Sequence, residues 1–294
     1  MIKKYFFLPH IIILIIGIII GSFFDFQINQ ALYSERNAFG IFVAAFGEYP
    51  AYFMIGFLGS YLVFAAFKHF LKEEKRFFVH NLTCGILGVV LSSYYFGNAI
   101  TNANGYMITG PMKAVWFIIA FFLVSPSFVL GYFIARKSKK EEWRIVFYIL
   151  FALAVSILFT TLVKEIMHRP RFRSIVANGA IPFKNWWEPT FEYKHFINDI
   201  VVSEDFKSFP SGHANITTTL IGAPYLIQLF TSKKPRKTRI FLEITCCVYA
   251  LFVSFTRMLV GAHFLTDVCF GGIITVIVYV IFIRILHNKK LLDF

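Results

Sequence analysis

The sequence predicts an all-α integral membrane protein that crosses the bilayer about eight times. Of its 294 residues, 57% are hydrophobic and only 15% are charged, whereas a soluble domain carries about a quarter charged residues. The mean hydropathy is +0.67. Several apolar runs approach or exceed the roughly 20 residues that cross the hydrocarbon core as a helix. These observations together exclude an ordinary soluble fold.

Eight apolar runs are candidates for the membrane spans. They are residues 6–24, 50–68, 79–99, 114–135, 145–166, 213–230, 240–257 and 263–286. The first run has a basic end and resembles a signal peptide, but it is long and no small-residue cleavage site follows it. We expect it to be retained as the first helix. We see no internal repeat and no soluble-domain boundary, so residues 1–294 are predicted to form a single polytopic membrane domain.

The net charge of +13 arises mainly from basic residues near the termini and in the connections between the spans. Lys and Arg concentrate in cytoplasmic loops of membrane proteins. Here 19 of the 29 lie near the two termini and in the connections 68–76, 136–144 and 231–239. This pattern predicts that both termini are cytoplasmic. The sequence has no RNA-binding motif and no basic stripe on a soluble face, so we do not expect nucleic acid as a partner.

The opposite side of the membrane breaks this trend in one segment. Seven of the other ten basic residues lie in 164–207. Basic residues are disfavoured on that side, and the simplest reason for their presence is that they bind an anion. The long connection 172–209 is also rich in Trp, Tyr and Phe. It is predicted to rest on the lipid headgroups or to shape a lipid-binding site as a lid or wall, and these two roles are compatible.

The cysteines do not indicate a metal or redox site. All four fall in apolar runs and none forms a CxxC pair, so we interpret them as small buried apolar residues. They are Cys84, Cys246, Cys247 and Cys269.

The first polar cluster, 164-KEIMHRPRF-172, stands where the fifth apolar run ends. The cluster contains Lys164, Arg169 and Arg171, and Arg173 follows it directly, so four basic residues lie close together in the sequence. Arg binds phosphate oxygens in a fork, and Lys binds them as a point charge. Snorkelling toward the membrane surface accounts for one or two such residues but not for all four.

The second cluster, 210-PSGH-213, stands where the sixth apolar run begins. The N–H groups and dipole of a helix start favour a phosphate, and Gly212 permits close approach to the backbone. A protonated His213 could donate to a leaving-group oxygen. Taken alone, the cluster could also be an ordinary helix cap beside a stray histidine.

The third cluster, 256-TRMLVGAHFLTD-267, spans the turn between the last two apolar runs. His263 and Asp267 are four residues apart and share a helix face. Asp267 could accept a hydrogen bond from one imidazole nitrogen and leave the other free to attack. Gly261 would let the chain bend so that Arg257 reaches the same pocket. A purely structural hydrogen bond is the alternative for this pair.

Together the clusters resemble the type 2 phosphatidic acid phosphatase family, also called the lipid phosphate phosphatase family. The family pattern is Lys-x6-Arg-Pro, then Pro-Ser-Gly-His, then Ser-Arg-x5-His-x3-Asp. This chain meets it with Lys164 and Arg171, with residues 210–213, and with Arg257, His263 and Asp267. Phe172 stands in place of the first proline, and Thr256 in place of the serine. Because another Arg-Pro pair occurs at Arg169-Pro170, Arg169 remains a possible phosphate ligand beside Arg171.

The resemblance implies a phosphohistidine mechanism without a metal or other cofactor. His263 would attack phosphorus, Asp267 would orient it, and His213 would protonate the leaving oxygen and then activate water. The implied phosphate-binding residues are Lys164, Arg171, Ser211, Gly212 and Arg257. The family core has six helices, so we expect the catalytic core at about residues 145–286 and assign part of residues 6–135 to an addition.

The predicted function is that of a lipid phosphatase in the cell membrane, with its active site on the extracytoplasmic face. Candidate substrates among the membrane lipids are undecaprenyl diphosphate, phosphatidylglycerophosphate and phosphatidate. A phosphotransferase that passes the phosphoryl group to a sugar or lipid shares the first half-reaction and stays open as an alternative. An anion transporter or channel is the alternative from another class, but neither mid-membrane charges nor inverted repeats support it.

Overall fold

A computed structural model describes residues 8–71, 74–102, 108–198, 201–230 and 236–292, in which all regular structure is helical. The N-terminal helices are α1 (Leu8–Leu32), α2 (Ala38–Phe46), α3 (Tyr49–His69), α4 (Lys75–Thr101) and α5 (Pro111–Lys137). The later α-helices are α6 (Trp143–Met167), α7 (Phe172–Ala177), α8 (Gly212–Thr218), α9 (Arg236–Leu259) and α10 (Leu265–Asn288). The 3₁₀ helices are η2 (Lys140–Glu142), η3 (Tyr193–Phe196), η4 (Ser203–Phe206) and η5 (Thr219–Leu229). Residues 6–7 of the first predicted span and five residues of the basic clusters lie outside the described residues: Lys3, Lys4, Lys72, Lys233 and Lys234.

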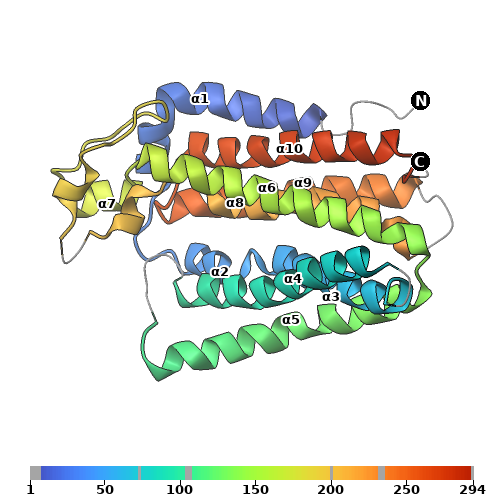
Figure 1. Ribbon diagram of the computed structural model, residues 1–294. Helices are drawn as coiled ribbons and strands as arrows, with labels where there is room; N and C mark the ends of the chain where they lie inside the picture. The colour runs from blue at the N-terminus through green and yellow to red at the C-terminus, as the bar shows by residue number, and fades with distance from the viewer. Residues whose placement is uncertain (1–7, 72–73, 103–107, 199–200, 231–235, 293–294) are drawn as a thin grey trace.

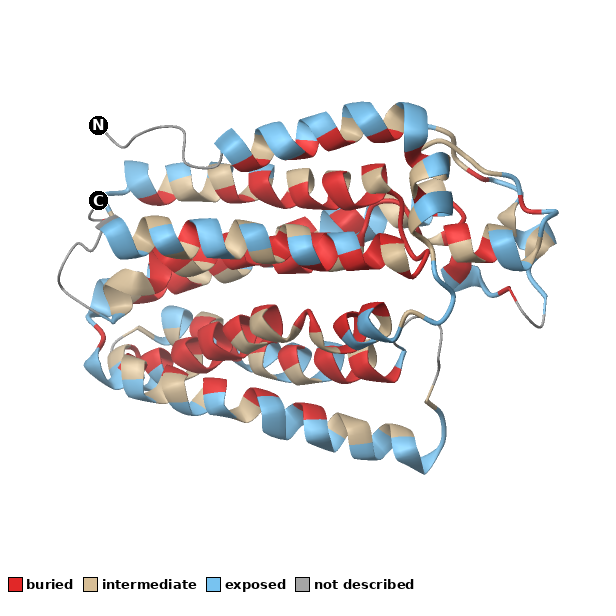
Figure 2. Cartoon of the chain, turned by 180° about the vertical axis from the view of Figure 1, so that it is seen from behind, coloured by how far each residue is buried: buried red, intermediate tan, exposed pale blue. Residues whose placement is uncertain are grey.

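The long helices lie side by side in one bundle, and α7 projects with the long loop from one end of it (Figure 1). Helices α3, α4 and α5 pack on one another, while α10 packs on α1, α6 and α8. Buried positions face the inside of the bundle and exposed positions face outward (Figure 2). The outward face of α1 consists of large apolar side chains, such as Ile19 and Phe23. Such a face suits contact with lipid, where the helix satisfies its own backbone hydrogen bonds.

Among the described residues, seven helical segments, rather than the predicted eight, are long and apolar enough to cross a membrane. The predicted span 213–230 differs, because it consists of the short α8 followed by η5. The hydroxyl groups of Thr217, Thr218 and Thr219 donate to carbonyls three or four residues earlier. Such bonds compete with the regular helical pattern, and Pro224 lacks a helical N–H donor. The segment is nonetheless buried and packs between α6, α9 and α10.

Helix α2 is an element that the sequence analysis missed. Its nine residues form a helix whose N-cap, Asn37, accepts a hydrogen bond from the N–H of Gly40 through its side chain. Residue Gly47 then leads into α3, which begins with Tyr49-Pro50. Helix α2 packs against α9 and α4, so it brings the α2–α3 junction close to the C-terminal half of the chain.

Helices α3 and α4 make a close contact through glycines. A Cβ atom on Gly59 would lie 2.7 Å from the carbonyl oxygen of Gly85 and from the N atom of Val89. Because both neighbours are backbone atoms, a rotamer change cannot relieve the overlap.

We therefore predict that Gly59→Ala lowers the stability of the protein by about 1–3 kcal/mol, the usual range for overpacking. Thermal unfolding in detergent measures this change. Gly179→Ala is the matched control, because nothing lies within 4 Å of a Cβ atom there. Equal melting temperatures for the two variants would contradict the close α3–α4 contact.

Candidate active site

The three predicted clusters lie together at the end of the bundle from which α7 projects (Figure 1). Helices α6 and α9 end there with Lys164 and Arg257 in their last turns. Helices α8 and α10 begin there. The ring centroids of His213 and His263 are 6.4 Å apart. The antiparallel course of the helices thus joins segments that are distant in sequence.

His263 is buried and held by a backbone carbonyl. Its Nδ1 lies 2.7 Å from the carbonyl oxygen of Ser208. Since a carbonyl only accepts, Nδ1 carries the proton and Nε2 is the unprotonated nitrogen. The sequence analysis assigned this orienting bond to Asp267, but the nearest Asp267 oxygen is 3.9 Å from Nδ1. The turn before His263 bends at Gly261 as expected, with φ of +61°.

Asp267 orients the loop around His263 instead of bonding the ring. Its Oδ2 accepts from the Ser208 hydroxyl and from the N–H of Phe264, the latter at 2.8 Å. Its Oδ1 accepts from Arg169 at 2.5 Å. The carboxylate therefore holds both the residue that bonds His263 and the residue that follows it.

Every nitrogen of the Arg169 guanidinium forms a hydrogen bond or an ion pair with another group of the protein. It is 1% exposed and forms buried ion pairs with Asp267 and with Asp25 of α1, the latter at 3.0 Å. Its Nε donates to the carbonyl oxygen of Lys184, and its Nη1 also donates to the hydroxyl of Thr266. Each of its three nitrogens has a partner, which favours Arg171 over Arg169 as the phosphate ligand.

Lys164 and Arg171 line the site next to the segment that precedes PSGH. The Lys164 ammonium donates to the carbonyl oxygen of Lys207 at 2.8 Å, and Arg171 Nε donates to that of Glu204 at 3.0 Å. Both side chains are only partly buried. The end of the long loop thus forms one wall of the site.

Arg257 is the most suggestive of the predicted phosphate ligands. Its side chain is 2% exposed, and within the described parts of the chain its Nε and Nη1 have no hydrogen-bond partner. A buried guanidinium without partners is costly, and an anion would satisfy it. Nearby, Ser211 caps α8 by accepting from the N–H of Ala214, and only the Lys164 side chain approaches the Cβ position of Gly212.

Comparison with known proteins identifies the family. A model of the PAP2 superfamily matches residues 145–291, which is half of the chain. The chain belongs to the PAP2 superfamily. No curated protein and no solved structure matches it. Because PAP2 proteins are generally phosphatases, membership supports a phosphatase-type activity on phosphate esters.

His213 of this PAP2 protein contacts the α2–α3 junction, which lies outside the matched residues. Its Nε2 is 3.3 Å from the carbonyl oxygen of Ala44, and its Nδ1 is 3.5 Å from Oε1 of Glu48. The His213 side chain is 24% exposed, whereas that of Glu48 is 7% exposed. His213 therefore lies between the N-terminal helices and the PAP2 core.

Burial and positive charge favour the neutral form of both histidines. The pKa of His263 lies well below its ordinary value because of burial, and the cations Lys164, Arg171 and Arg257 lower it further. Burial and Arg257 lower the pKa of His213 in the same way. A neutral His263 suits a nucleophile. A bound phosphate dianion would offset the cations and favour the protonated state that His213 needs as a general acid.

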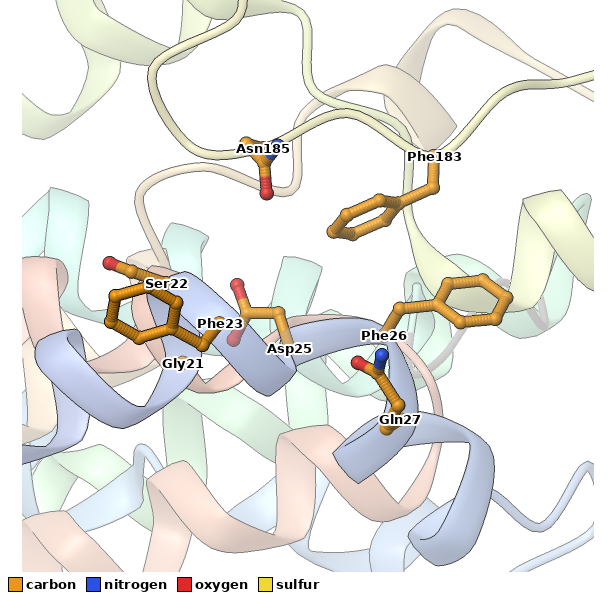
Figure 3. A pocket seen from close by; sticks show the side chains of 8 residues that line it. All are labelled: Gly21, Ser22, Phe23, Asp25, Phe26, Gln27, Phe183 and Asn185. Carbon is orange, nitrogen blue, oxygen red and sulfur yellow. The ribbon is translucent and has the colours of Figure 1, made fainter.

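A cavity of about 290 Å³ lies beside the site, between α1 and the long loop. Figure 3 shows Phe183 and Asn185 of the loop opposite Asp25 and its neighbours on α1. None of the predicted catalytic or phosphate-binding residues lines this cavity, so it is separate from the candidate site. The described residues contain no group of three His, Cys, Asp or Glu side chains arranged for a metal ion.

The sequence analysis missed three residues of the site: Asp25, Glu48 and Ser208. Asp25 and Glu48 were acidic residues in or beside apolar runs, where a charge is costly and therefore informative. Ser208 adjoins PSGH, but its carbonyl and hydroxyl bonds depend on the tertiary structure.

We predict that Arg169 and Arg171 substitutions have different effects. Arg169→Gln leaves Asp25 and Asp267 buried without their cation, which should cost about 3–5 kcal/mol of stability. Arg171→Gln should leave the melting temperature within a few degrees and reduce kcat/KM for phosphate release about 10²-fold. Thermal unfolding and phosphate release measure the two effects.

The double variant Asp25→Asn/Arg169→Gln provides the control for Arg169, since removing the unpaired carboxylate should recover part of the lost stability. If Arg169→Gln instead melted like the wild type and lost activity, Arg169 would be the phosphate ligand.

Proposed function

We propose that this protein removes a terminal phosphate from a lipid phosphate or diphosphate at the extracytoplasmic face of the cell membrane. The observation that carries the proposal is the position of His263 among Lys164, Arg171 and Arg257, whose Nε and Nη1 have no hydrogen-bond partner among the described residues. Fixed cations around a nucleophile stabilise the charge of a phosphoryl group in the transition state.

The proposed reaction has two steps. In the first, Nε2 of His263 forms a bond to phosphorus, the bond from phosphorus to the leaving oxygen breaks, and His213 gives that oxygen a proton. In the second, His213 takes a proton from water, whose oxygen displaces the histidine and releases inorganic phosphate. Lys164, Arg171 and Arg257 hold the phosphoryl oxygens through both steps, together with Ser211 and Gly212 of PSGH.

A lipid substrate is supported by the surroundings of the site. In the part of the chain that the structure describes, seven helical segments are long and apolar enough to span a membrane, and the site lies at one end of their bundle. The adjoining loop exposes Trp187 and Phe191, 50% and 78% respectively, and exposed aromatic side chains favour the membrane interface. Undecaprenyl diphosphate, phosphatidylglycerophosphate and phosphatidate are the candidate substrates.

The proposed reaction predicts that purified protein releases phosphate from at least one of these lipids. His263→Ala should abolish release and also the acid-labile phosphoenzyme, because His263 is the proposed acceptor of the phosphoryl group. The matched control is His195→Ala, which changes an exposed histidine of the long loop. Retention of more than a few per cent of activity by His263→Ala would refute the mechanism, and transfer of phosphate to an added sugar or lipid would indicate a phosphotransferase.

The extracytoplasmic location predicts a labelling pattern in intact cells. Residues Gly179 and Lys139 are both exposed, the first in the long loop and the second in the basic connection after α5. After the four native cysteines are replaced by Ala, Gly179→Cys should react with a membrane-impermeant maleimide in intact cells. Lys139→Cys should react only after permeabilisation. The opposite result would place the active site in the cytoplasm.

A further inference from the structure

Two groups at the α2–α3 junction, the carbonyl of Ala44 and the carboxylate of Glu48, lie next to His213 and can only accept hydrogen bonds. The Ala44 carbonyl oxygen lies 3.3 Å from Nε2, and Oε1 of Glu48 lies 3.5 Å from Nδ1. A neutral imidazole has one N–H and can satisfy only one of them, whereas an imidazolium can donate to both. The junction therefore favours the doubly protonated ring.

Glu48 is held in place for this contact. It stands at the N-cap of α3, and its other oxygen, Oε2, accepts from the hydroxyl of Tyr52 at 2.8 Å. The adjoining carbonyl of Gly47 accepts from the hydroxyl of Tyr249 on α9 at 2.9 Å. A carboxylate fixed in this way in a buried setting interacts strongly with a nearby positive charge.

The other charged groups around His213 act in the opposite direction. They are Arg257 from α9, Arg171 from the segment before α7 and Lys164 from the end of α6, and His263 lies on a fourth side. All three cations disfavour a protonated ring. Glu48 is the one carboxylate within ion-pair distance of His213 among the described residues.

We propose that Glu48 is a positioning residue for catalysis, which orients His213 and keeps it protonated as the general acid. This inference rests on the proposed function, because it assumes that His213 protonates the leaving oxygen. In its ionised form Glu48 stabilises the imidazolium, His213 gives one ring proton to the leaving oxygen, and the carboxylate supports reprotonation when His213 takes a proton from water. Residues outside the PAP2-matched region thus complete the acid–base group of the site.

The test compares Glu48→Gln with the wild type on two phosphate esters across pH 5–9. A long-chain alkyl phosphate needs a protonated leaving oxygen, whereas p-nitrophenyl phosphate does not. We expect Glu48→Gln to reduce kcat/KM for the alkyl phosphate about tenfold at neutral pH, which corresponds to a fall of about one unit in the His213 pKa. For the alkyl phosphate, the alkaline limb of the pH profile of kcat/KM should move to lower pH. For p-nitrophenyl phosphate, kcat/KM should change by about threefold or less.

Two further variants separate positioning from simple damage. Glu35→Gln, an exposed carboxylate in the preceding loop, is the matched control and should behave like the wild type. Combining Glu48→Gln with His213→Ala should cost no more than His213→Ala alone, because Glu48 acts through that ring. An equal loss on both esters, with an unchanged pH profile, would overturn the proposal.

A measurement without substrate tests the pairing of Glu48 with His213 separately from the phosphatase assignment. The pKa of His213 can be followed by the ¹⁵N shifts of histidine-labelled protein in micelles, with His213→Ala identifying its resonances. We expect Glu48→Gln to lower this pKa by about one unit, and an unchanged pKa would overturn the pairing. If Glu48→Gln does not fold, Glu48→Asp, which moves the carboxylate away from Nδ1, should give a smaller fall in the same direction, and no fall would overturn it. Absence of phosphate release by the wild type would refute the proposed function without affecting this result.

Discussion

The buried guanidinium of Arg169 between Asp25 and Asp267 is the interaction on which the site depends. It joins the first helix, the segment after α6 and the start of α10. A buried ion pair is only tolerated when its remaining hydrogen-bonding capacity is satisfied, and here Thr266 and the carbonyl of Lys184 provide the other partners. The Asp267 carboxylate is then fixed against Ser208, and the Ser208 carbonyl fixes His263. His263, the proposed nucleophile, is therefore oriented through a charge that does not contact it.

The proposed phosphate site differs from the Arg169 cluster in the partners of its buried cation. Arg257 is buried with two nitrogens unpartnered among the described residues, which is unfavourable unless an anion binds. The same cations lower the pKa of His263, so the charge that we propose to bind phosphate also favours the neutral form of the proposed nucleophile. Arg169 and Arg171 are only two residues apart, but they differ in role and therefore in their surroundings. One neutralises buried carboxylates, and the other faces the partly exposed site.

The N-terminal helices are more than a membrane anchor for the PAP2 core. Asp25 of α1 completes the ion pairs of Arg169, and Glu48 with the carbonyl of Ala44 contacts His213. Neither acidic residue lies in the region that the family model matches. The matched region therefore contains the proposed reacting groups, while residues outside it contact them or their partners. This arrangement gives a physical reason for α1 and α2 to pack against the C-terminal helices.

Much of this protein was predictable from the sequence because hydropathy and motif spacing are local properties. The all-helical membrane fold followed from the long apolar runs, and the joint pattern from Lys164 to Asp267 identified the family. The predicted span 213–230 is helical and buried, but α8 continues as the 3₁₀ helix η5, and it is not among the seven described segments that are long and apolar enough to cross a membrane. The bonds from Thr217, Thr218 and Thr219 to backbone carbonyls, which compete with the regular helical pattern, cannot be inferred from hydropathy alone. Likewise, the spacing of His263 and Asp267 could not show that a backbone carbonyl would bond the ring. The partners Asp25, Glu48 and Ser208 were decided by the tertiary structure alone, since burial of a charge or a donor creates a need for a partner that can come from any part of the chain.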